Sequence, residues 1–238
     1  MNFKTRLLIG IASVAFAAPL SATIINPGQC NGTGCTPNTV QNFGTITSLG
    51  TFLVGDTDNI IAPQVLGKTE FTGTLRTAVY RNASGFLDFY YQFTNTSVAA
   101  TTNMGEVSRI TTVSFGGFTT DVGFTNTDID GAGGSTGVNF LAPTVWQTPD
   151  KADRSTAPGS TLGFNFTANV GSGTIAAGET SSILVVRTNA LSYNVGQTNL
   201  INGAVASAAT FAPVPEPTTY ALMGAGLVAL GLIRRIRQ

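Results

Sequence analysis

The chain has 238 residues, enough for one large domain or two small ones with a buried core. Charged residues make up only 10% of it, against about a quarter in ordinary soluble domains, and the formal net charge is zero. The sequence has no histidine, which excludes a Ser-His-Asp hydrolase, a Cys-His protease and a His-ligated zinc site.

The zero net charge hides an uneven distribution. Five of the twelve basic residues lie in the two terminal segments. Between residues 23 and 217, seven Lys or Arg stand against twelve Asp or Glu, a net charge of −5. This mildly acidic middle has no basic stripe, so we expect no nucleic-acid partner.

The chain begins with a segment typical of a secretory signal peptide. In MNFKTRLLIGIASVAFAAPLSA, a basic start is followed by an apolar run from Leu7 to Ala18 and then by small residues. We predict a signal peptide over residues 1–22, cleaved after Ala22. The alternative is a permanent anchor, but a twelve-residue run is too short for a hydrocarbon core of about 30 Å.

The only two cysteines, Cys30 and Cys35, follow in CNGTGC. In an oxidising compartment they could close a small disulfide loop, because Gly32 and Gly34 allow tight closure. Two free thiols in an N-terminal tail are the alternative. We assign residues 23–40 to an N-terminal extension that carries this pair.

The middle of the chain, residues 41–213, shows short alternating strands separated by turn residues. In LDFYYQF, Leu87, Phe89, Tyr91 and Phe93 occupy one face, and the preceding NASG is typical of a hairpin turn. Abundant threonine, with valine, isoleucine and phenylalanine at the apolar positions, favours pleated strands over helices. We therefore predict an all-β fold, one antiparallel β-sandwich of about eight to ten strands. The polar stretch at 148–160 is expected to be a loop that covers one end.

No residue pattern in this middle identifies a catalytic site. Asp128 and Asp130 precede glycines, but the pattern lacks the further oxygen ligands of a calcium loop, and we expect neither a metal nor a cofactor. Trp146 and the pair Tyr90-Tyr91 could stack on a sugar ring, or they could belong to the core. A glycoside-active enzyme needs only two carboxylates, but the sequence brings no such pair together.

The chain ends with PEPTTYALMGAGLVALGLIRRIRQ, in which Pro215, Glu216 and Pro217 precede an uncharged run of sixteen residues, 218–233. As a helix this run would cover about 24 Å, slightly less than a typical hydrocarbon core. Arg234, Arg235 and Arg237 follow and would stop transfer on the cytoplasmic side. The prolines favour an extended peptide just before the predicted transmembrane helix.

This tail, residues 214–238, resembles the PEP-CTERM sorting signal of Gram-negative bacteria. The resemblance implies that an exosortase recognises Pro215-Glu216-Pro217 and that the inner membrane holds the precursor only transiently. A permanent anchor with a stiff stalk is the alternative.

The resemblance and the middle together lead to a functional hypothesis. We expect an exported protein without enzymatic activity, located at the cell surface or in the extracellular matrix and associated with exopolysaccharide or biofilm. A carbohydrate-binding module is the alternative, and a glycoside-active enzyme comes third.

Overall fold

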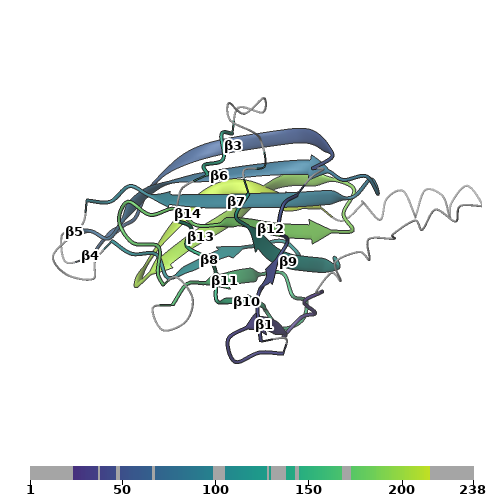
Figure 1. Ribbon diagram of the computed structural model, residues 1–238, viewed down its shortest axis with the longest axis horizontal. Helices are drawn as coiled ribbons and strands as arrows, with labels where there is room; N and C mark the ends of the chain where they lie inside the picture. The colour runs from purple at the N-terminus through teal and green to yellow at the C-terminus, as the bar shows by residue number, and fades with distance from the viewer. Residues whose placement is uncertain are drawn as a thin grey trace, which may run out of the picture.

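A computed structural model describes residues 24–36, 38–46, 49–65, 68–98, 105–127, 129, 138–142, 145–167 and 173–214. Several predicted features lie outside these residues: the signal peptide with Ala22, the residues Asp128 and Asp130, and the tail from Pro215 onward. Within them the protein is all-β, as predicted, and its two large sheets pack face to face as a sandwich (Figure 1).

The first sheet has six strands in the order β2-β9-β12-β7-β6-β3. Its hairpin of β6 and β7 turns at the predicted NASG sequence, where the backbone amide of Asn82 donates to the carbonyl of Phe86. All its pairs are antiparallel except β2 with β9, which is parallel. The bounds are β2 Gln41–Asn42, β3 Thr51–Ile61, β6 Thr72–Arg81, β7 Leu87–Asn95, β9 Thr120–Thr125 and β12 Ile183–Thr188.

The second sheet also has six strands, in the order β1-β10-β11-β8-β13-β14, and every pair is antiparallel. Its longest pair is the hairpin of β13 and β14, which turns at Gly203. The bounds are β1 Cys30–Gly32, β8 Arg109–Thr112, β10 Lys151–Arg154, β11 Leu162–Asn165, β13 Tyr193–Asn202 and β14 Ala204–Pro213. A two-stranded hairpin stands apart from both sheets, with β4 at Gln64–Val65 and β5 at Lys68–Thr69.

The main core lies between the two sheets, and alternation along the strands produces it. The predicted inward face of β7 is buried there, with Phe89 and Phe93 fully enclosed. From the second sheet, β14 contributes the buried Ala206 and Ala208, and its Phe211 packs partly buried against the same core. Burial of this apolar surface is the main favourable term for the fold.

A second core covers the opposite face of the first sheet, and here the simple alternation misleads. Tyr90 points away from the main core, yet it is fully buried together with Ile183 and Val185. Phe43, Val138 and Phe140 cover it from loops. The side-chain amide of Gln92 donates to the carbonyl of Leu141 at 2.9 Å and accepts from its amide at 2.8 Å, which fixes the covering segment. The central strands of the first sheet, β7 and β12, are therefore buried on both faces.

The described residues form fourteen strands, more than the expected eight to ten. Several extra strands have only two or three residues, too few to show a period-two pattern. The expected extension 23–40 contributes β1 to the second sheet and Ile25 to the main core. The stretch 148–160, expected as a loop, contains β10 between β1 and β11.

Candidate functional site

The described structure ends where the predicted sorting tail begins. Pro213 is the last residue of β14, and Val214 follows it. The amide of Val214 donates to the carbonyl of Ser192 at 3.1 Å, and the Ser192 hydroxyl donates to the carbonyl of Val214 at 3.3 Å. The residue immediately before Pro215 is thus fixed to the turn between β12 and β13.

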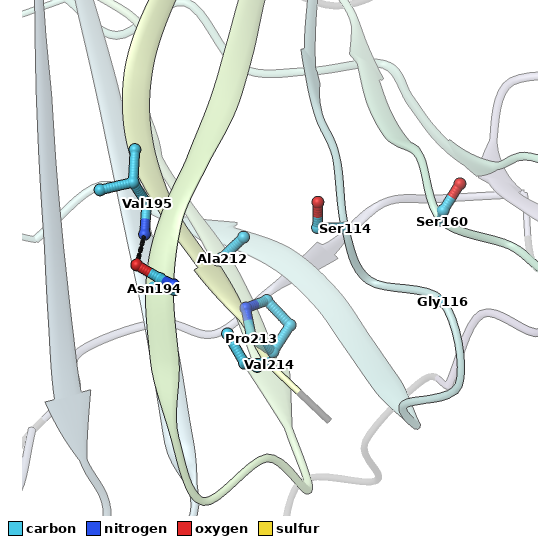
Figure 2. Close-up of a pocket in the computed structure, with 8 residues that line it drawn as sticks. All are labelled: Ser114, Gly116, Ser160, Asn194, Val195, Ala212, Pro213 and Val214. Carbon is cyan, nitrogen blue, oxygen red and sulfur yellow. Dashed lines mark hydrogen bonds between the residues drawn. The ribbon is translucent and has the colours of Figure 1, made fainter. Parts of the chain in front are cut away.

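Figure 2 shows an open hollow beside this last residue, between the β13–β14 hairpin and two neighbouring loops. Its volume is about 380 Å³. No charged side chain lines it, and its polar groups are hydroxyls and one amide. The lining residues are Ser114, Gly116, Ser160, Asn194, Val195, Ala212, Pro213 and Val214.

A buried arginine, Arg154, holds the loops around this hollow together. It is the last residue of β10 and only 5% exposed. A guanidinium group has five N–H donors, and all five are used here. The acceptors are the carbonyls of Ile25, Phe115, Phe118 and Gly159 and the hydroxyl of Thr120.

Burial lowers the pKa of Arg154, but an arginine side chain stays charged in a protein. The sequence interpretation missed this residue because it treated 148–160 as a loop. The strand could have been found from the alternation in Lys-Ala-Asp-Arg, which places Ala152 and Arg154 on the same buried face.

A second, polar pocket of about 340 Å³ lies over β1, β8, β10 and β11. At its centre Arg109 forms a two-point ion pair with Asp153, each N–O distance being 2.6 Å. Asn165 joins both partners. Burial acts to raise the pKa of Asp153, but the hydrogen bonds from Arg109 and Asn165 outweigh it and hold that pKa below its usual value. These central groups therefore bind one another, while Asp150 and Lys151 line the rim.

The aromatic residues considered for sugar stacking do not form a platform. Tyr90 and Tyr91 are 0% and 2% exposed and lie in different cores, so of the two alternatives for this pair, sugar stacking and core packing, the structure supports core packing. Burial raises the pKa of both phenols above the usual value. Trp146 is half-buried and packs against the second core.

The two cysteines lie at the edge of the second sheet. Cys30 and Cys35 form a disulfide, with their Cα atoms 5.6 Å apart. Gly32 has a φ of +108°, and a Cβ at that position would collide with the backbone of Asp150. The small loop therefore starts on β1 and packs closely against the chain that leads into β10.

The described residues contain no group of three or more His, Cys, Asp or Glu that could hold a metal ion. The same part of the chain has no helix long and apolar enough to cross a bilayer. The predicted helix 218–233, the motif Pro215-Glu216-Pro217 and the three arginines all lie outside it.

Comparison with known proteins assigns the end of the chain. The family model of the PEP-CTERM protein-sorting motif matches residues 213–238. The match starts at Pro213, which is also the last residue of β14. No curated protein and no solved structure matches the chain.

Proposed function

The chain is a PEP-CTERM sorting domain-containing protein, and from this premise we propose that its sandwich is a non-enzymatic cargo displayed at the surface of a Gram-negative cell or in its extracellular matrix. The motif implies export through a membrane-anchored precursor and processing by an exosortase. The proposal adds that the mature sandwich associates with exopolysaccharide or biofilm.

One observation carries this proposal: the sorting motif is continuous with the folded domain. Pro213 belongs to both, and Val214 is hydrogen-bonded to Ser192. A flexible linker would allow the sandwich to work independently of the tail. With no linker, the whole sandwich is presented to the membrane-embedded processing enzyme as one rigid body.

The polar groups of the second sheet support a display role over a catalytic one. Arg109, Asp153 and Asn165 satisfy one another, and the lowered pKa of Asp153 keeps it ionised. A general acid needs a raised pKa near the working pH. Asp88 on β7 does have a raised pKa, but its carboxylate is only 5% exposed and accepts a hydrogen bond from Asn82. It is therefore poorly placed to contact a substrate.

The substitution Glu216→Ala tests the sorting part of the proposal. It keeps the apolar run and its arginines but removes the carboxylate between the two prolines. Expressed in a host with an exosortase, the variant should accumulate as full-length precursor in the membrane fraction, while the wild type is shortened. Intact mass distinguishes the two forms. Thr219→Ala is the matched control and should be processed normally. A wild-type protein that keeps its last twenty residues would refute the sorting hypothesis.

A carbohydrate-binding module is the second candidate, and the polar pocket on the second sheet favours it. Its volume falls at the lower end of the range of ligand pockets, and Thr33, Lys151 and Thr167 offer hydrogen-bonding groups at its rim. Pull-down with purified exopolysaccharide tests both candidates. Binding that is lost in Lys151→Ala would place a sugar site at this pocket, and binding that is lost in Trp146→Ala would place it instead over the second core, where Trp146 packs. Binding that neither variant weakens would support general association with the matrix.

A further inference from the structure

The two ends of the sandwich differ in charge. We call the end that carries Val214 the tail end; its described loops are residues 24–29, 49–50, 82–86, 113–119, 155–161 and 189–192. The strand pairing places them together: Thr51 and Leu87 both lie opposite Arg81, and Thr188 lies opposite Thr120. These loops contain no charged residue.

The acidic residues next to the tail-end loops, Asp88 and Asp121, are buried within strands, whereas at the opposite end the connections carry acidic residues. There β3 ends at Ile61 opposite Thr72, and the described connections contain Glu70, Glu106, Asp150 and Glu179. Lys68, in β5, is the basic residue among these connections. Figure 1 shows the two ends of the sandwich: the hairpin β4–β5 lies at the left, at the opposite end, and the turn between β6 and β7 lies at the right, at the tail end. The polarity of the sandwich therefore follows its long axis.

Two apolar side chains project from the tail end close to its last residue. Leu191 is 45% exposed and immediately precedes Ser192, which holds Val214. Phe86 is 37% exposed, in the neighbouring turn. Arg81 links the two turns, because its guanidinium donates to the carbonyls of Gly85 at 2.8 Å and Leu191 at 3.2 Å. The surface next to the tail thus combines exposed apolar groups with the cation of Arg81 at its border.

The length of the tail limits how far this surface can be from the membrane. Four peptide steps separate Val214 from Thr218, and an extended chain covers at most about 14 Å over that length. The headgroup layer accounts for about 5–8 Å on each side of the hydrocarbon core. As a helix, the apolar run 218–233 would cover about 24 Å, less than a core of about 30 Å, and a short span draws its flanking residues toward the interface.

We propose that the tail end of the sandwich is a membrane-docking surface, which rests on the lipid headgroups while the precursor is anchored. The proposed partner is the lipid surface itself. The uncharged loops can approach the headgroups without desolvating a charge, Phe86 and Leu191 can enter the interface, and Arg81 suits anionic lipid. The acidic opposite end faces away. This orientation holds Pro215-Glu216-Pro217 close to the membrane surface, where a membrane-embedded enzyme can bind it.

The inference rests on the anchored precursor of the proposed function, and its test uses the full-length chain in liposomes of phosphatidylethanolamine and phosphatidylglycerol without exosortase. An environment-sensitive fluorophore is attached in Ser84→Cys at the tail end. Ser84 is exposed and is held by its backbone amide, so the substitution preserves the turn. Val98→Cys, at a position 91% exposed on the opposite end, is the matched control. Cys30 and Cys35 are joined to each other and do not compete for the label.

Lipids with a nitroxide headgroup should quench the label at Ser84→Cys several-fold more than the label at Val98→Cys. A flexible Gly-Ser spacer of about twelve residues after Val214, with a root-mean-square span of roughly 20 Å, should remove most of this difference. A Leu191→Glu substitution should also weaken the quenching, because it brings a carboxylate to an anionic surface.

Three results would overturn the proposal. Equal quenching at both positions would show that the tail end does not touch the lipid. A change in the environment of the Ser84→Cys label that appears only when exosortase is added would assign the surface to the enzyme. A change that grows with the protein-to-lipid ratio would assign the surface to a second copy of the chain. A full-length protein that fails to float with the liposomes would instead refute the anchored precursor, so the two failures are distinguishable.

Discussion

Tyr91 on β7 donates its hydroxyl to the carbonyl of Phe211 on β14 at 2.8 Å, across the two sheets of the sandwich. The same hydroxyl accepts from the hydroxyl of Thr112 on β8 at 3.3 Å. Phe211 lies two residues before the end of β14, so this bond ties the strand that leads into the sorting motif to the opposite sheet.

We expect Tyr91→Phe to lower the free energy of unfolding by about 1–2 kcal/mol, because it removes the Tyr91 hydroxyl that donates to the partly buried carbonyl of Phe211. Urea denaturation measures the loss. The control is Tyr193→Phe on β13, whose half-buried ring packs edge-on against Phe211. The control should change stability by no more than about 0.5 kcal/mol. Equal losses in the two variants would mean that the hydrogen bond does not connect the sheets.

Replacement of the buried Arg154 should have a larger effect. Arg154→Met keeps most of the side-chain volume but removes all five donors from the carbonyls and hydroxyl that converge on it. Buried polar groups that lose their partners cost about 1–3 kcal/mol each, so we expect a loss of at least about 3 kcal/mol. Arg81→Met, which removes two bonds from a partly exposed arginine, should cost about 1 kcal/mol. If both arginines proved equally dispensable, Arg154 would not organise the tail end.

The stability of the protein should depend on the ionisation of Asp88. Burial raises its pKa from 3.8 to about 6, although the hydrogen bond from Asn82 and the nearby Arg187 partly oppose this. Because the folded-state pKa is the higher one, the folded protein binds the proton more tightly than the unfolded chain. The contribution to stability is therefore complete below about pH 4 and is lost as the pH rises through about 6.

Asp88→Asn should remove this dependence, since it keeps an acceptor for Asn82 but cannot ionise. At about 1.4 kcal/mol per pKa unit, the shift corresponds to roughly 3 kcal/mol, so the variant should be more stable than wild type at pH 7 and similar to it near pH 4. Thermal melts across this pH range measure the difference. Asn59→Gln, an exposed and non-ionisable position on the edge strand β3, serves as control and should follow the wild-type profile.

The sequence predicted the architecture where strands are long and one face is apolar. Leu87, Phe89 and Phe93 show the alternation clearly, and the predicted turn joins their strand, β7, to β6. Prediction was weaker where burial comes from distant segments. Nothing local to Tyr90 indicates that Phe140 will cover it, because that contact depends on a loop some fifty residues later in the chain. Short edge strands were not predicted for a similar reason. Cys30–Gly32 is a strand because it pairs with β10, and its own three residues show no strand pattern.

The candidate site divides in the same way. The sorting motif is a contiguous pattern, so Pro215, Glu216 and Pro217 could be recognised from the sequence, and the family match covers them. The tail end is different, because it is assembled from loops spread between residues 24 and 192. Their shared lack of charge becomes visible only when the strand register brings them together. Arg154 belongs to this second kind, since its acceptors come from three separate segments of the chain, around residues 25, 115–120 and 159.

The last prediction concerns the disulfide between Cys30 and Cys35, which closes a loop directly after β1. In the chain-entropy model a loop this short contributes about 2 kcal/mol, and here the constraint also holds β1 against β10, the strand that ends in Arg154. We expect the exported protein to react with no alkylating reagent until it is reduced, as read by mass spectrometry. Reduction should then lower the free energy of unfolding by about 2 kcal/mol, with the first loss of amide protection at β1. The double variant Cys30→Ser with Cys35→Ser is the matched control: it should resemble the reduced wild type and should not respond to reductant. Two thiols that alkylate in the unreduced mature protein would show that the bond does not form, and the edge of the second sheet would then depend on the pairing of β1 with β10 alone.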